Sequence, residues 1–262
     1  MKKDFFMKDS YHTEKNTHRL FLDRLMINTR LYFMCKYLNI VRKSHRAALR
    51  GQYDTEAWAL SSYDVFKLIE GCGGRFHITG LENLHKCKGP VVFISNHMST
   101  LETMVFPCLI APFINVTFVV KDSLVKHPIF GPIMRSRDPI VVSRENSRAD
   151  FQIVMKQGRE LLANGVSIIV FPQNTRTVEF VPQDFNTLGV KLASHAKVQV
   201  VPIAIKTDFW GNGKYLKDLG PIRRSKPIHM AFGESLSING SGKEENKTII
   251  KFISSHLEKW HD

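Results

Sequence analysis

From residue 90 onward, short apolar runs rich in β-branched residues alternate with longer stretches of helical periodicity, and few folds accommodate that alternation. Near-continuous apolar strands between helices indicate a sheet that is mainly parallel and covered on both faces. The expected fold is therefore α/β, with a mainly parallel central sheet, helices on both faces and N-terminal amphipathic helices before it. Strands are expected at residues 75–79, 90–95, 114–120, 139–143, 166–171, 198–205 and 227–232.

The first 50 residues carry much of the positive charge of the chain. The formal net charge is +13, and residues 1–50 hold 12 Lys and Arg against 4 Asp and Glu, a difference of +8. Residues 1–17 are polar and are expected to form a tail. Through residues 18–49, apolar positions recur at three- and four-residue steps with arginines among them, which predicts a helix. A second helix is expected at 56–69.

A basic helix with large apolar side chains can lie in a bilayer interface. The alternative is a helix that packs on its own domain and leaves its cations in water. We divide the chain into residues 1–70, a tail and basic amphipathic helices for docking to a membrane surface, and residues 71–262, the α/β domain.

The longest uncharged run, residues 103–120, raises the question of a membrane span. Pro107, Pro112 and Asn115 interrupt it, so a buried helix followed by a buried strand is expected instead. The 11 histidines show no HExxH pattern and the four cysteines show no CxxC spacing, so no metal site is expected.

The first polar motif, N-H-M-S-T-L-E at residues 96–102, directly follows a predicted strand. A histidine at a strand end can face a cleft, and its neutral ring can accept a proton near pH 7. A carboxylate bonded to the other ring nitrogen would fix the tautomer, and Glu102 can point back toward His97 from the first helical turn. The alternative is a capping box from Ser99 to Glu102, in which Glu102 bonds the N-cap amide without touching His97.

Two further segments place arginines at strand ends. The turn F-P-Q-N-T-R-T at residues 171–177 can present backbone N–H groups to a phosphate, and Arg176 adds a forked cation that suits one. Arg144 follows the predicted strand at 139–143 and could face the same cleft. The alternative for both arginines is an ordinary surface position in solvent. The apolar segment V-V-P-I-A-I at 200–205 could form a wall for an acyl chain or plain core.

In this order and spacing, the four segments resemble the motifs of the glycerolipid acyltransferase family, typified by the 1-acyl-sn-glycerol-3-phosphate (lysophosphatidic acid) acyltransferases. The resemblance covers about residues 76–235. The first family motif is N-H-x-S-x-x-D, matched by Asn96, His97 and Ser99, with Glu102 in place of the aspartate. The second motif ends in an arginine, matched by Arg144.

The third family motif is F-P-E-G-T-R-S, matched here at Thr175 and Arg176 and at the leading Phe-Pro, and the fourth is V-P-I/V-A, matched at residues 201–204. Gln173 replaces the glutamate and carries no charge. Asn174 replaces the glycine, and asparagine tolerates positive φ better than most residues. Together with Glu102, these departures could signal a different acceptor headgroup or a weakened enzyme. Retained activity is the preferred reading because the histidine, a carboxylate and both arginines remain.

The resemblance implies transfer of a fatty acyl group from acyl-CoA or acyl-carrier protein to the free hydroxyl of a lysophospholipid, with 1-acylglycerol-3-phosphate as the expected acceptor. It implies His97 as general base, Glu102 as its orienting carboxylate, and Arg144 and Arg176 as holders of the acceptor phosphate. The other expected substrate-binding residues are Asn96, Ser99, Gln173, Asn174 and Thr175. The acyl thioester is a co-substrate, and no cofactor is expected. The expected location is the cytoplasmic face of a membrane, as a peripheral protein on an anionic surface.

Three alternatives remain open at the level of sequence. The charge of +13 allows a nucleic-acid-binding module, but the chain shows no helix-turn-helix, RRM or zinc-finger signature. An acyltransferase for a non-glycerophosphate acceptor, such as an amino-lipid, would need less from the phosphate-binding turn. A catalytically weakened lipid-binding relative would account for the three departures from the family motifs.

Overall fold

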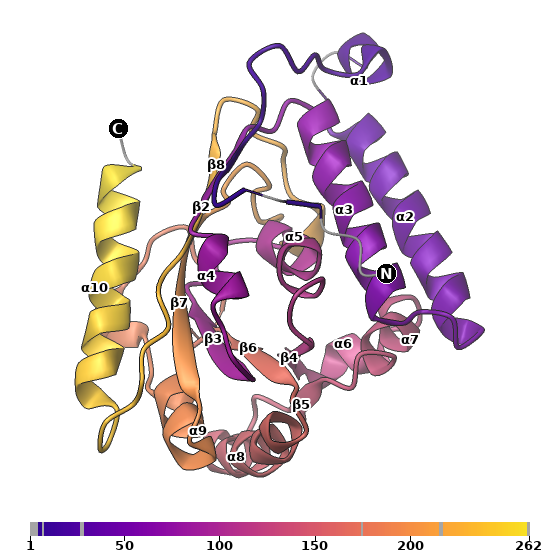
Figure 1. Cartoon of the computed structure of the whole chain (residues 1–262). Coiled ribbons are helices and arrows are strands. Elements are labelled where there is room, and N and C mark those ends of the chain that lie inside the picture. The colour runs from indigo at the N-terminus through magenta and orange to yellow at the C-terminus, as the bar shows by residue number, and fades with distance from the viewer. Residues whose placement is uncertain (1–4, 7, 27–28, 174, 215–216, 261–262) are drawn as a thin grey trace.

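The computed structural model describes the chain apart from residues 1–4, 7, 27–28, 174, 215–216 and 261–262. At its centre is one eight-stranded sheet in the order β1-β2-β8-β7-β3-β6-β4-β5 (Figure 1). The strands are β1 (Tyr11–His12), β2 (Phe76–Thr79), β3 (Val91–Ser95), β4 (Val116–Lys121), β5 (Ile140–Val142), β6 (Ser167–Val170), β7 (Gln199–Lys206) and β8 (Ile228–Phe232).

The block β7-β3-β6-β4-β5 is parallel throughout. Strand β8 pairs antiparallel with β7, β2 pairs parallel with β8, and β1 closes the edge antiparallel to β2. The prediction of a mainly parallel α/β sheet is therefore confirmed. The carboxyl ends of β3, β5, β6 and β7 meet at one edge of the sheet, where sites in such folds are built.

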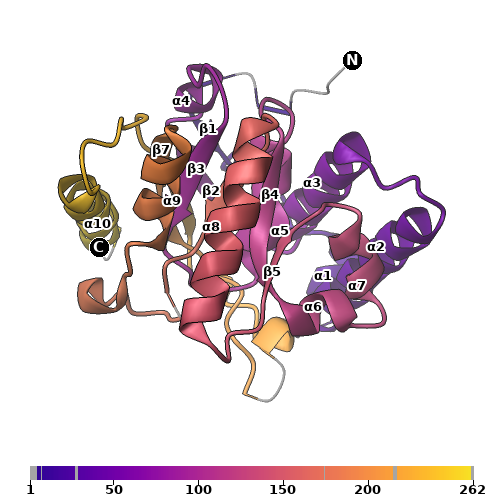
Figure 2. The same ribbon diagram turned by 90° about the horizontal axis from the view of Figure 1, so that it is seen from below.

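Helices cover both faces of the sheet (Figures 1 and 2). Helices α3 and α5 lie on one face, with α2 outside α3, and helices α8, α9 and α10 lie on the other. The helices are α1 (Phe21–Leu25), α2 (Leu31–Leu49), α3 (Thr55–Gly71), α4 (Glu82–His85), α5 (Leu101–Ile110), α6 (Asp122–Lys126), α7 (Phe130–Arg135), α8 (Ser147–Ala163), α9 (Leu188–Ala196) and α10 (Lys243–Lys259), with the short 3-10 helices η1 (Pro182–Asp184) and η2 (Lys217–Leu219).

The strand that leads into the first motif, β3, is buried from solvent on both faces of the sheet. All five residues of β3 are buried, which explains why its sequence is apolar without alternation. On one face, α9 comes close to β3 because Gly189 has no side chain: a Cβ there would lie 2.6 Å from Cδ1 of Ile94. On the other face, Phe66 of α3 stacks on Phe76 of β2 at 3.9 Å between ring centroids.

The predicted tail at residues 1–17 is wrong at Tyr11 and His12, which form β1 and extend the sheet. The single helix predicted over 18–49 is also wrong, because the structure has α1 and α2 in its place. The reason lies in tertiary contacts: Asp23 of α1 is fully buried and pairs with Arg19 and with Arg224, which lies about 200 residues away in the chain. Helices α6 and α7 were not predicted.

The uncharged run at 103–120 folds as a buried helix, α5, followed by a strand, β4, as predicted. Pro107 lies inside α5 and does not interrupt it, so the break falls after Ile110. Among the described residues, no helix combines the length and the apolar character needed to cross a bilayer.

Candidate active site

The loop between β3 and α5 begins at Asn96, which ties the ends of two strands together. Its Nδ2 donates to the carbonyl of Ile205 and its Oδ1 accepts from the N–H of the same residue, both at 2.9 Å. Both ends of the amide are therefore used on β7, and the residue is buried. The sequence predicted a substrate contact for Asn96, whereas the structure shows it holding the start of the loop.

His97 comes next, and its ring is bonded to a buried carboxylate. Nδ1 of His97 lies 2.9 Å from Oε1 of Glu102; the His97 side chain is 12% exposed and that of Glu102 is 0% exposed. The sequence allowed two roles for Glu102, orienting His97 or capping α5. The structure shows both, because the same oxygen accepts the N–H groups of Met98 and Ser99 at 2.7 and 2.8 Å.

The second oxygen of Glu102 is also fully used. Oε2 accepts from the hydroxyl of Ser99 at 2.9 Å and from that of Thr207 at 2.7 Å, so the carboxylate accepts five hydrogen bonds in total. Burial raises the pKa of Glu102, but the hydrogen bond and charge of His97 and the donors from Ser99 and Thr207 outweigh it and hold the pKa below its ordinary value. Since an ionised carboxylate only accepts hydrogen bonds, Nδ1 of His97 carries a hydrogen, and in the neutral form of the ring Nε2 carries the lone pair.

The third motif fixes His97 from the other side. The ring of Phe171 stacks on that of His97, with centroids 4.2 Å apart and planes 19° apart. The N–H of His97 donates to Oε1 of Gln173 at 2.6 Å, and Nε2 of Gln173 donates to the hydroxyl of Thr177 at 2.9 Å. The backbone N–H of Thr177 in turn donates to the carbonyl of His97 at 3.0 Å. Gln173, which the sequence placed among the substrate-binding residues, is buried and braces the loop that carries His97.

Arg176 points to a carboxylate that the sequence analysis did not single out. Its Nη1 donates to the hydroxyl of Thr100 and to Oδ1 of Asp218, the latter at 2.6 Å. The hydroxyl of Thr100 donates to the same Asp218 oxygen at 2.7 Å. Burial raises the pKa of Asp218, but the hydrogen bonds from Arg176 and Thr100 outweigh it, so this pKa lies below its ordinary value. In this structure, Arg176 is therefore ion-paired.

Arg144 lies just after β5 in the left-handed region, with φ of 60°. Its N–H donates to Oδ2 of Asp150 at 2.7 Å, and the N–H of Ser143 donates to the other Asp150 oxygen at 2.9 Å, which holds this turn. Burial lowers the pKa of Arg144, and the positive charge of Arg176 lowers it further. The like charge of Arg176 therefore acts on Arg144, and the sequence predicted that both arginines hold the phosphate.

The remaining predicted residues lie at different depths. Ser99 is buried against Glu102, and Thr175 is exposed in the turn after β6. Asn174 lies outside the described residues.

Sequence reasoning missed Thr207, Asp218 and Asn212. Thr207 directly follows β7 and is buried against Glu102, and Asn212 donates from Nδ2 to the carbonyl of Met98 at 2.9 Å. A polar residue just past an apolar strand was the available signal for Thr207. Asp218 lies in no motif, and only the folded chain brings it to Arg176.

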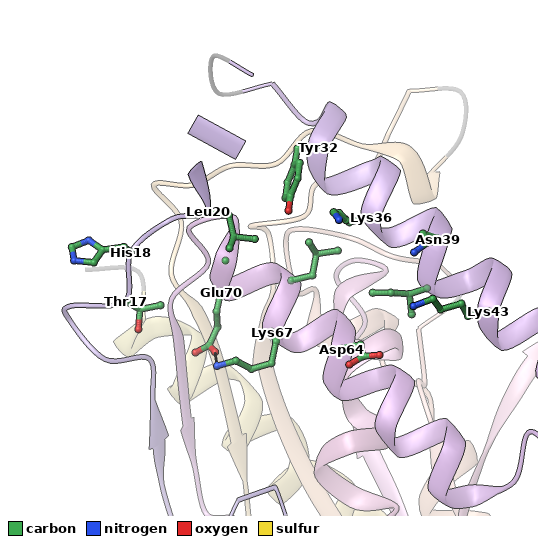
Figure 3. Close-up of a pocket in the computed structure, with 13 residues that line it drawn as sticks. Thr17, His18, Leu20, Tyr32, Lys36, Asn39, Lys43, Asp64, Lys67 and Glu70 are labelled. Atoms are coloured by element: carbon green, nitrogen blue, oxygen red, sulfur yellow. Dashed lines mark hydrogen bonds and ion pairs between the residues drawn. The ribbon is translucent and has the colours of Figure 1, made fainter. Parts of the chain in front are cut away.

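A separate groove of about 580 Å³ lies between α2, α3 and the segment before α1 (Figure 3). Tyr32 and Lys36 line it from α2, and the ion pair of Lys67 with Glu70, at 2.5 Å, lines it from α3. None of the predicted site residues contributes to it. The groove belongs to the N-terminal helices and is distinct from the centre around His97.

Comparisons with known proteins identify the family of the chain. The model of the acyltransferase family matches residues 75–206, which contain all four motifs. A 1-acyl-sn-glycerol-3-phosphate acyltransferase of Pseudomonas aeruginosa is 27% identical over 211 residues, which make up 80% of this chain and 76% of that protein. One from Chlamydomonas reinhardtii is 33% identical over 148 residues, 56% of this chain and 41% of that protein.

The fold also matches a solved structure. The crystal structure of the 1-acyl-sn-glycerophosphate acyltransferase of Thermotoga maritima aligns with a TM-score of 0.68 and 18% identity, covering 91% of this chain and 96% of that one. At this identity, the match establishes a shared fold.

Proposed function

The chain belongs to the acyltransferase family, and we propose that it transfers a fatty acyl group from an acyl thioester to the free hydroxyl of 1-acylglycerol-3-phosphate. Its relatives in Pseudomonas aeruginosa and Chlamydomonas reinhardtii are 1-acyl-sn-glycerol-3-phosphate acyltransferases, which supports this acceptor. The observation that carries the chemistry is the bond from Nδ1 of His97 to the buried Glu102 at 2.9 Å. It leaves Nε2 as the nitrogen that can take a proton.

In this proposal, the acceptor hydroxyl is the nucleophile. Its oxygen attacks the thioester carbonyl carbon while its proton moves to Nε2 of His97, and Glu102 stabilises the imidazolium that forms. The tetrahedral intermediate collapses with cleavage of the carbon–sulfur bond, and the departing thiolate takes the proton back. A carbon–oxygen bond has formed, a carbon–sulfur bond has broken, and His97 is restored. No covalent acyl-enzyme is needed.

The test is acyl transfer from radiolabelled acyl-CoA and acyl-carrier protein to a panel of lysophospholipids and one amino-lipid acceptor. Transfer to 1-acylglycerol-3-phosphate is expected. The Arg144→Gln variant should raise the KM for this acceptor about tenfold, because it removes one of the two cations near the phosphate, and should change kcat little. Arg159→Gln, on the exposed surface of α8, is the matched control. Absence of transfer to every phosphorylated acceptor would sink the proposal.

Docking to a membrane surface is the second part of the proposal. An apolar patch around α1 lies open to solvent, with the side chain of Phe21 75% exposed. Arg30 at the start of α2 donates to the carbonyl of Leu219, next to Asp218, so the patch is tied to the loop that reaches the site. Arg24 and Arg30, which lie within the same stretch of the chain, are exposed. The patch consists of Leu20, Phe21, Leu22, Leu25, Met26 and Leu31.

Replacing Phe21 and Leu25 together with aspartate should weaken binding to vesicles of phosphatidylglycerol and phosphatidylcholine. The expected loss is about 100-fold, from two apolar side chains that no longer enter the interface. Co-sedimentation with vesicles measures it. Phe151→Asp, at an exposed position of α8 on the opposite face of the sheet, serves as control. Equal binding by the double variant and wild type would refute the patch as the docking surface.

A further inference from the structure

One carboxylate already occupies the predicted phosphate site. Oδ1 of Asp218 lies 2.6 Å from Nη1 of Arg176 and 2.7 Å from the hydroxyl of Thr100. Thr100 belongs to the first motif and Arg176 to the third, whereas Asp218 arrives from η2, 42 residues further along the chain. The carboxylate of Asp218 therefore provides a negative charge at the position where the first and third motifs contact each other.

The pair is reachable from solvent. The side chain of Asp218 is 47% exposed and that of Arg176 is 20% exposed, so solvent reaches both members of the ion pair. Carboxylate and phosphate oxygens bind an arginine in the same way, through charge-assisted hydrogen bonds from its N–H groups. An acceptor phosphate that approaches Arg176 must therefore displace Asp218 or share the guanidinium with it.

Resting on the acceptor chemistry proposed above, we infer that Asp218 is a specificity-determining residue, which competes with the acceptor headgroup for Arg176 and disfavours dianionic phosphomonoesters relative to monoanionic phosphodiesters. Two arginines and one aspartate leave a net charge of about +1 around the headgroup. A phosphomonoester carries about −1.5 to −2 charges near neutral pH, whereas a phosphodiester carries one. Asp218 repels the first more strongly, by Coulomb's law.

Asp218 stays charged and in place over the neutral range. Burial raises the pKa of Asp218, but the hydrogen bonds from Arg176 and Thr100 and the charge of Arg176 outweigh it, so this pKa lies below its ordinary value. The carbonyl of the next residue, Leu219, accepts a hydrogen bond from Arg30, which directly precedes α2, and this bond anchors η2. Competition with the headgroup is therefore a fixed property of the site near pH 7.

The test is Asp218→Asn, assayed with two acceptors that carry the same acyl chain. The KM for 1-acylglycerol-3-phosphate should fall about three- to tenfold, since removing a partly exposed ion-pair partner frees one cation for the phosphate. The KM for 1-acylglycerophosphoglycerol should fall by less than about twofold, and kcat should change little for either. Glu244→Gln removes a carboxylate from an exposed ion pair with Lys247 on α10 and should leave both KM values unchanged.

A KM for the phosphomonoester that rises or stays unchanged, with wild type active, would overturn the inference while leaving the proposed function intact. Absence of transfer by wild type would count against the proposed function alone, because calorimetric titration with glycerol 3-phosphate still tests the inference. Asp218→Asn should bind glycerol 3-phosphate more tightly than wild type, and equal or weaker binding would overturn it. Asp218→Ser, a second variant without the charge, should behave as the asparagine variant does.

Discussion

Replacing His97 with glutamine should lower the rate of acyl transfer about 10²- to 10⁴-fold, the range that a positioned general base contributes. Glutamine keeps a polar group near Glu102 but has no nitrogen that can accept a proton near pH 7. The acceptor hydroxyl would then have to lose its proton to water. The rate is measured at saturating donor and acceptor, with radiolabelled acyl-CoA and 1-acylglycerol-3-phosphate.

His195→Gln is the matched control, because it removes an exposed histidine at the end of α9. It should transfer acyl groups at the wild-type rate. His195→Gln should unfold at the wild-type temperature, whereas His97→Gln should unfold at a lower one, because the buried Glu102 loses the hydrogen bond and charge of His97. The rates are therefore compared at a temperature at which both variants are folded. Transfer by His97→Gln at more than a tenth of the wild-type rate would refute His97 as the base.

The parts of this centre that the sequence predicted are those whose contacts are local. His97 and Glu102 are five residues apart, so the start of one helix is enough to bring them together. The polar residues of three motifs lie at the ends of β3, β5 and β6. Because the carboxyl ends of parallel strands lie at the same edge of a sheet, the sequence predicted that these motifs would be neighbours. Periodicity and strand topology therefore sufficed for the general position of His97, Arg144 and Arg176.

The parts that the sequence could not give depend on contacts between distant residues. Thr207 meets Glu102 across 105 positions, and Asp218 meets Arg176 across 42. No sequence pattern predicts either contact, because a loop after one strand can bring its residues next to the end of any other strand. The break between α1 and α2 has the same origin, since the buried pair of Asp23 with Arg224 is invisible to helical periodicity.

Gln173 has a structural role that its place in the motif did not indicate. Its place in the third motif suggested contact with substrate, yet its amide accepts from the N–H of His97 and donates to Thr177. An amide does both tasks at once, because it has a donor and an acceptor at fixed positions. The missing charge of this residue is therefore compatible with a well-ordered His97 loop.

Replacing Glu102 with glutamine should be the most damaging change at this centre. Five donors converge on the Glu102 carboxylate, and an amide would turn its own N–H₂ group toward some of them. The buried donors left without an acceptor should lower the free energy of unfolding by about 3 kcal/mol. Transfer should also fall at least about 100-fold, because His97 loses the charge that stabilises its imidazolium. Urea unfolding and the transfer assay measure the two effects.

The pH dependence of protein stability provides an independent test of the role of Glu102. The pKa of Glu102 in the folded chain lies below its ordinary value of 4.5, so its ionised form stabilises the fold above that value. This stabilisation is lost as the pH falls through the lower, folded pKa. Wild type should therefore lose stability on acidification below about pH 4.5 more steeply than Glu102→Gln, which has no proton to gain there. Parallel slopes for the two proteins would contradict the assigned ionisation.

Glu102→Asp restores the aspartate of the family motif. It keeps the negative charge but shortens the side chain, so it tests the effect of side-chain length alone. The aspartate side chain is one methylene shorter than that of glutamate. Its carboxylate should keep the hydrogen bonds from the N–H groups of Met98 and Ser99. It should lose the hydrogen bond from the hydroxyl of Thr207, which lies 2.7 Å from Oε2 in the wild type. Thr207→Val should then destabilise the wild type by about 1 kcal/mol and the aspartate variant by much less, a coupling that a double-mutant cycle measures. An equal loss of unfolding free energy in both backgrounds would show that the contribution of Thr207 does not depend on its hydrogen bond to Glu102.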